Sequence, residues 1–132
     1  MMRLIDHLGN GWAIMGAAEA LTALEQFPTL RRNSPRYSEL LQNFQFHAGN
    51  LSLLQNKQNG KFHNVLNNPD TFTETSATAM ILTALLRGWQ YQWLDESYLP
   101  IIEKGRGILP ISPLFLPKSS LYFKRFIENH VV

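Results

Sequence analysis

The chain has 132 residues, the length of one ordinary domain, and 45% hydrophobic against 17% charged residues exclude an intrinsically disordered chain. It contains no cysteine, so disulfides and thiolate metal sites are excluded. No apolar run approaches the roughly 20 residues of a transmembrane helix, and the N-terminus lacks the apolar core of a signal peptide. We therefore expect no membrane partner and, by default, a cytoplasmic location, unless the chain is part of a longer secreted protein.

The net charge of +2 is unevenly distributed. Residues 1–103 contain seven basic and nine acidic side chains, and residues 104–132 contain five basic and one acidic side chain, so the two parts carry −2 and +4. A nucleic-acid surface needs clustered lysines and arginines, usually with aromatic stacking groups. The first part has no such cluster, and we expect no nucleic-acid partner.

The first half of the chain predicts a pair of helices. Small and apolar residues at three- and four-residue spacing predict a helix over 12–26, which ends before Pro28. A loop follows, and Ser34 as N-cap with Pro35 at the first helical position predicts the start of a bulkier helix over 35–55.

The second half repeats this order. Residues 55–73 are rich in turn formers, with an Asn59-Gly60 turn and at most a short extended piece after it. A small-residue helix is predicted over 76–88, capped by hydroxyls of the 73–76 segment, and a further helix over 96–105. Two hairpins of one repeating helical architecture are therefore expected. Because such arrays normally need three or more units, we also expect self-association through exposed inner helices.

The C-terminal segment, 110–132, is predicted to be a separate, irregular tail. Pro110, Pro113 and Pro117 interrupt its apolar run, although a last short helix could begin at Ser119 and continue to Ile127. The sequence leaves open a poorly ordered extension or a segment that docks on a partner or membrane surface.

Few residues are candidates for chemistry. Trp12 either offers its indole face to a sugar ring or is a core tryptophan after a tight turn. Glu74 either places favourable charge at a helix N-terminus or accepts hydrogen bonds from a polyol. His7 beside Asp6 has acid/base chemistry, yet neighbours on an extended chain point to opposite sides. The remaining histidines have no metal-ligand spacing and no phosphate loop is present, so no metal or cofactor is expected.

Three motifs occur in the order of a known family. They are Asp-His-Leu-Gly-Asn-Gly-Trp-Ala at 6–13, Gln-Asn-Gly-Lys-Phe at 58–62, and Phe-Thr-Glu-Thr-Ser-Ala-Thr-Ala-Met at 72–80. Together they resemble the second half of the unsaturated rhamnogalacturonyl and glucuronyl hydrolases, glycoside hydrolase families 88 and 105, over residues 5–109. The resemblance implies an all-α fold, a partial α/α toroid of the six-hairpin glycosidase type, over residues 1–109.

The resemblance also implies an activity and a set of sugar contacts. Family members remove a Δ4,5-unsaturated uronic acid from pectin- or glycosaminoglycan-derived oligosaccharides, where an aspartate protonates the double bond and activates the water that hydrates it. The implied partner is an unsaturated uronic-acid oligosaccharide. Asn10 and Trp12 would contact the sugar from one side and Glu74 and Ser76 from the opposite rim, with His7 as a further substrate-binding candidate.

The sequence departs from the family pattern in two places. Leu8 stands where many members have a substrate-holding arginine, and the general acid/base aspartate, which lies well upstream of Asn10-Gly11-Trp12, is missing. We therefore assign no catalytic residue and expect an incomplete or inactive fragment. The alternative is a non-catalytic sugar-binding or helical-repeat interaction module.

Overall fold

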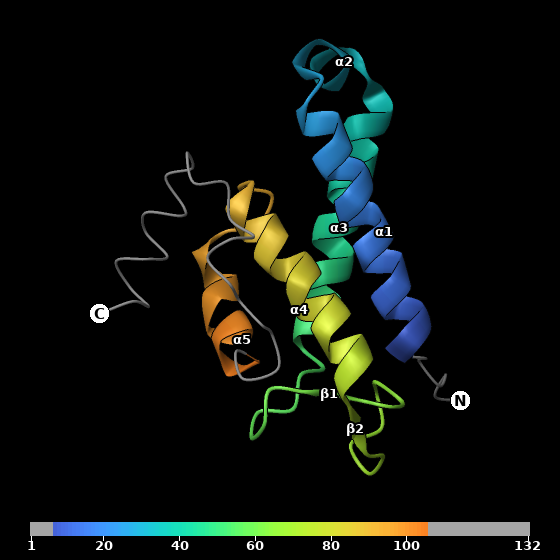
Figure 1. The fold of residues 1–132 in the computed structure, drawn as a ribbon, viewed down its shortest axis with the longest axis vertical. Coiled ribbons are helices and arrows are strands. Elements are labelled where there is room, and N and C mark those ends of the chain that lie inside the picture. Colours follow the sequence, from blue (N-terminus) through green and yellow to red (C-terminus); the bar gives the residue numbers. More distant parts are fainter. Residues whose placement is uncertain (1–6, 106–132) are drawn as a thin grey trace.

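The computed structural model describes residues 7–105 (Figure 1). Predictions for the tail, including the helix from Ser119 to Ile127, lie outside the described residues. None of the helices within 7–105 is long and apolar enough to cross a membrane. The elements, in chain order, are α1 (His7–Glu25), α2 (Pro28–Asn33), α3 (Pro35–Ser52), β1 (Phe62–His63), β2 (Thr73–Glu74), α4 (Thr75–Gln90), the 3-10 helix η1 (Glu96–Tyr98) and α5 (Leu99–Lys104).

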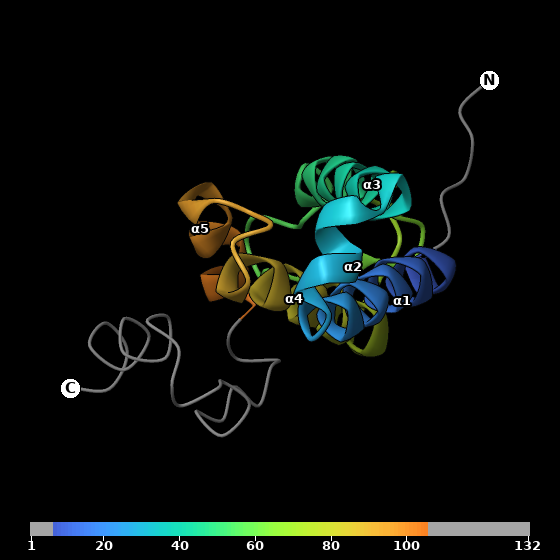
Figure 2. The ribbon, with the colours of Figure 1, turned by 90° about the horizontal axis from the view of Figure 1, so that it is seen from above.

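The helices form two layers. Helices α1 and α4 lie side by side in one layer, and α3 and α5 lie behind them in the other (Figure 2). Both α1 and α4 run in the same direction, so their N-terminal ends lie at the same end of the molecule, while α3 and α5 return the opposite way (Figure 1). The predicted all-α arrangement of two hairpins is thereby confirmed.

The apolar core lies between these layers. Helix α1 buries one stripe, Ile14, Ala18 and Leu21, at the spacing of a single helical face. Half of the residues of α4 are buried, because α1 and α5 pack against it and Phe44 of α3 lies against Gly88. The opposite side of α1, which includes Gly16 and Ala20, is exposed. Of the two small-residue helices, α4 is therefore enclosed and α1 is open along one side.

The loop between the hairpins contains the predicted turn and a two-stranded sheet. Gly60 has φ of +74°, and a side chain there would collide with the carbonyl oxygen of Lys104, so only glycine fits. Strand β1 pairs antiparallel with β2, with Phe62 opposite Glu74. This pairing holds Thr73 and Glu74 in extended backbone, so the helix predicted over 76–88 begins at Thr75, directly after β2.

Two further differences concern helix ends in the first hairpin. The segment 28–33, predicted as a loop, is helix α2, and Pro28 occupies its first turn just as Pro35 does in α3. Ser34 is at the N-cap position of α3, as predicted, but its side chain makes no capping hydrogen bond. Both prolines stand at helix starts, but only the start at Pro35 was predicted from the sequence.

Candidate functional site

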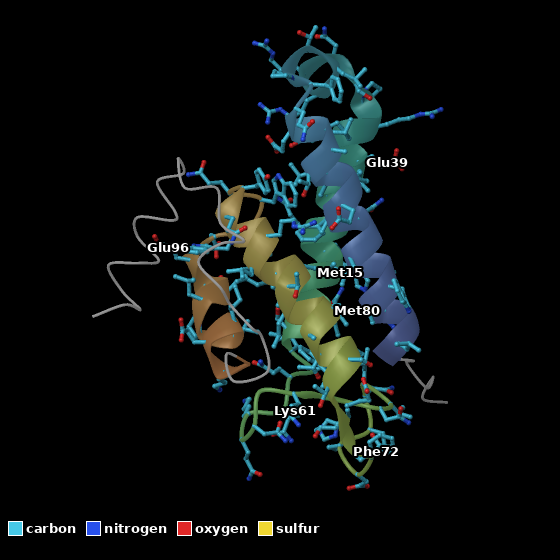
Figure 3. The ribbon with its side chains drawn as sticks, in the orientation of Figure 1. Met15, Glu39, Lys61, Phe72, Met80 and Glu96 are labelled. Atoms are coloured by element: carbon cyan, nitrogen blue, oxygen red, sulfur yellow. The ribbon has the colours of Figure 1, made fainter. Side chains whose placement is uncertain are left out.

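The N-terminal ends of α1 and α4 are in direct contact. Gly11 is buried against the first turns of α4, and a Cβ atom on it would lie 3.0 Å from Met80 Cε and 3.6 Å from Ala77 Cα. Figure 3 shows Met80 between the two helices. The absence of a side chain at Gly11 therefore permits this close approach. It brings the motif at 6–13 and the motif at 72–80 to the same end of the molecule.

Trp12 lies on the surface at this end. Its side chain is 67% exposed, and Leu8, one helical turn before it, is 41% exposed. The alternative of a core tryptophan is therefore wrong. The indole of Trp12 does not pack in the core, and its flat apolar face is exposed near the helix N-termini, where it could cover one face of a sugar ring.

Asn10 is connected to the outer layer through a histidine. The imidazole Nε2 of His47, on α3, donates a hydrogen bond to Asn10 Oδ1 at 2.9 Å. An amide oxygen only accepts hydrogen bonds, so Nε2 carries the proton. Half-burial of His47 lowers the pKa of its imidazole below the ordinary value, which favours the neutral ring at pH 7.

Glu74 and Ser76 lie together at the start of α4. The carboxylate of Glu74 accepts a hydrogen bond from the backbone N–H of Ala77 at 2.8 Å, so Glu74 is the N-cap of the helix. This confirms the interpretation of Glu74 as charge at a helix N-terminus. The expectation that hydroxyls cap this helix was wrong, because Ser76 Oγ instead donates to the same carboxylate at 2.8 Å.

Thr78 holds β1 against the start of α4, a role that the sequence did not predict. It is completely buried, and its Oγ1 accepts a hydrogen bond from the backbone N–H of Phe62 at 2.9 Å while donating to the carbonyl of Glu74. This fixes β1 against the first turn of α4. A threonine on the apolar face that Ala77 and Ile81 share was the available sign of such a role.

The histidines other than His47 lie apart from Asn10 and Trp12 or outside what the structure describes. His7 is the first residue of α1, and its side chain lies outside what the structure describes, so its substrate contact stays a prediction. His63 is buried, where Nδ1 donates to the Thr71 carbonyl at 2.7 Å and Asn56 Nδ2 donates to Nε2 at 3.4 Å. Within residues 7–105 no three histidine or acidic side chains are placed to hold a metal ion.

A hollow of about 450 Å3 lies at the other end of α4. Trp89 and Trp93 line it, together with Asp95 and Glu96, and the Trp93 indole N–H donates to Glu25 at 2.9 Å. These aromatic rings are buried and bonded within the core, in contrast to Trp12. The hollow is therefore separate from the candidate site at the helix N-termini.

Two layers of helical hairpins, with parallel inner helices whose N-terminal ends carry the polar motifs, define the architecture of six-hairpin glycosidases. The model of Glycosyl Hydrolase Family 88 matches residues 8–109, and the chain belongs to this family. No curated protein matches the chain.

Two solved structures are similar to this chain. A glycosyl hydrolase family 88 protein from Bacteroides vulgatus is 26% identical, with a TM-score of 0.70 over 83% of this chain and 30% of its own. A possible member of the GH105 family from Salmonella enterica subsp. enterica serovar Paratyphi A is 24% identical, with a TM-score of 0.67 over 76% of this chain and 25% of its own. The second likeness shows the fold alone. The chain spans 25% and 30% of the lengths of these two proteins.

Proposed function

We propose that this chain is the sugar-binding part of a hydrolase fold that recognises a Δ4,5-unsaturated uronic acid at the end of a pectin- or glycosaminoglycan-derived oligosaccharide. The observation that carries the proposal is the exposure of Trp12, 67% of its side chain, where the N-termini of α1 and α4 meet. Family membership supports a carbohydrate ligand. The uronide and its unsaturation come from the motif resemblance.

Each candidate residue has a defined part in this proposal. The indole of Trp12 covers the apolar face of a sugar ring. Ser76 Oγ donates its hydrogen to Glu74 and keeps acceptor lone pairs for a sugar hydroxyl, so Glu74 orients Ser76. Asn10 contacts the sugar through its amide, and His7 extends the same surface.

We assign no general acid or base to the chain, so the proposal is binding without turnover. The family reaction, hydration of the double bond, needs an aspartate for which no residue here matches the motif position. Leu8 at the place of the family arginine also removes a cation that would hold the uronate. We therefore expect no enzyme-dependent loss of the ultraviolet absorbance of the double bond when the protein is incubated with an unsaturated digalacturonate.

The binding proposal is tested by tryptophan fluorescence. Titration with unsaturated digalacturonate should change the emission, and Trp12→Phe should remove most of this change. Trp89→Phe and Trp93→Phe, which alter buried rings, are the matched controls and should keep it. An unchanged spectrum in the wild type, with no heat of binding by calorimetry, would exclude the sugar site.

We also propose a second candidate function, a helical-repeat module that associates through the exposed side of α1. This side carries Leu8 and Trp12 together with small residues such as Gly16 and Ala20, which allow a helix of a second copy to approach closely. Light scattering during gel filtration should then give a mass above 15.1 kDa. Ala20→Glu should restore the monomer, whereas a monomer in the wild type would exclude this function.

A further inference from the structure

His47 is placed unusually for a residue on the buried side of α3. Its neighbours on that side, Phe44, Ala48 and Leu51, are buried and apolar, and they fill the core between the layers. His47 interrupts this face with a polar ring that is half-buried. An apolar side chain would satisfy packing alone at this position, so the imidazole requires another explanation.

The hydrogen bond of His47 supplies that explanation. Its Nε2 donates to the side-chain oxygen of Asn10, 37 residues earlier in the chain and in the other layer, rather than to any backbone carbonyl of α1. The Asn10 side chain is therefore held by a contact from outside its own helix.

The bond also sets the polarity of Asn10. Because Oδ1 faces the imidazole, Nδ2 of the same amide is turned away from His47. Fixing an amide before a ligand arrives lowers the entropy lost on binding, since one fewer side chain is immobilised in the complex.

We propose that His47 is a positioning residue, which holds the amide of Asn10 in the one orientation that binds the sugar. The proposal rests on the proposed function, because Asn10 must contact the ligand for its orientation to matter. In this way a residue of α3 contributes to sugar binding, although the sugar is bound at the N-terminal ends of α1 and α4. His47 itself does not touch the sugar.

The test compares two replacements of His47 with matched size and opposite chemistry. His47→Leu removes the N–H donor, and His47→Gln keeps one within reach of Asn10 Oδ1. With unsaturated digalacturonate as the probe and calorimetry as the measurement, His47→Leu should raise Kd by about 3- to 10-fold, the value of one net hydrogen bond. His47→Gln should stay within about 2-fold of the wild type, because the donor is retained.

A double-mutant cycle with Asn10→Ala separates positioning from general stabilisation. Once Asn10 has lost its amide, His47→Leu should cause no further change in Kd, because the two residues act as one unit. Urea unfolding of each variant shows whether a weakened Kd only reflects unfolded protein. If His47→Leu does not fold, His47→Met replaces it in the same cycle.

The outcomes distinguish this inference from the proposed function. Wild-type binding that His47→Leu leaves intact, or an effect of His47→Leu that adds fully to that of Asn10→Ala, overturns the positioning role and keeps the sugar site. Equal losses in His47→Leu and His47→Gln also overturn it. Absence of binding by the wild-type protein overturns the proposed function, and the positioning role with it.

Discussion

The buried hydroxyl of Thr78 is hydrogen bonded to the backbone N–H of Phe62, at 2.9 Å from nitrogen to oxygen. The bond joins the loop between the hairpins to the helix that follows it. Since Phe62 is completely buried, its N–H has no access to water and depends on this partner.

Thr78→Val should therefore destabilise the protein by about 1–3 kcal/mol, because the substitution keeps the shape and leaves a buried N–H unsatisfied. Thr78→Ser is the control that keeps the hydroxyl and loses one methyl group. Amide hydrogen exchange of Phe62 measures the effect directly. Exchange should accelerate in Thr78→Val and stay slow in Thr78→Ser; slow exchange in both would show that the hydroxyl is not the partner that matters.

The exposed Trp12 and the buried Trp93 should differ in how much their replacement by alanine lowers the free energy of unfolding. Its exposed ring contributes little to folding, so Trp12→Ala should change the free energy of unfolding by less than about 1 kcal/mol. Trp93, 5% exposed and stacked on Tyr91, should cost about 3–5 kcal/mol when replaced by alanine. Urea unfolding followed by circular dichroism compares the two. A loss of similar size in Trp12→Ala would mean that this ring packs on the core after all.

Glu25 connects the two hairpins and should be sensitive to loss of its acceptor atoms. Its carboxylate accepts from the Trp93 indole at 2.9 Å and pairs with Arg31, and its side chain is 18% exposed. Glu25→Leu should destabilise by about 1–3 kcal/mol, since the Trp93 N–H then lacks a partner. Glu25→Gln retains an oxygen and should cost less, and a reversed order of the two in chemical unfolding would contradict this assignment.

Acid should destabilise the protein through His47. Burial lowers the pKa of His47 in the folded state, so between the folded value and about 6.5 the unfolded chain binds more protons. The contribution of His47 to the free energy of unfolding is therefore fully present above pH 6.5, and it is lost as the pH falls through this window. The decrease should disappear in His47→Gln, and the difference between the two curves, measured by thermal or urea unfolding, isolates this residue. Parallel curves would mean that His47 titrates as a solvent-exposed histidine does.

Sequence patterns predicted the helices well where the determinant is local. Pro35 fixes φ at a helix start, and Gly60 marks a turn that other residues do not adopt, so both could be predicted from a few neighbouring residues; Pro28 fixes φ in the same way, but the helix that it begins was not predicted. The extended backbone of Thr73 could not be predicted in this way, because it depends on pairing with His63, ten residues earlier in the chain.

For the candidate site, the sequence suggests residues but not their arrangement. The motifs named Asn10, Trp12, Glu74 and Ser76, yet the exposure of Trp12 depends on which side of α1 meets α4. The bond from His47 to Asn10 spans two layers, and no spacing rule connects positions 37 residues apart. Whether Glu74 caps α4 is likewise decided by the strand that sets its backbone.

The pairing of α1 with α4 also has a consequence for the order of folding during synthesis. The ion pair of Glu19 with Arg87 joins the two helices, and the bond of Glu25 with Trp93 joins α1 to the segment just after α4; each connects residues 68 positions apart. A ribosome that adds about 5–20 residues per second needs roughly 3–14 s to cover that distance. During this time α4 cannot cover the apolar stripe of α1, so Ile14 and Leu21 lack this packing partner until the second hairpin emerges.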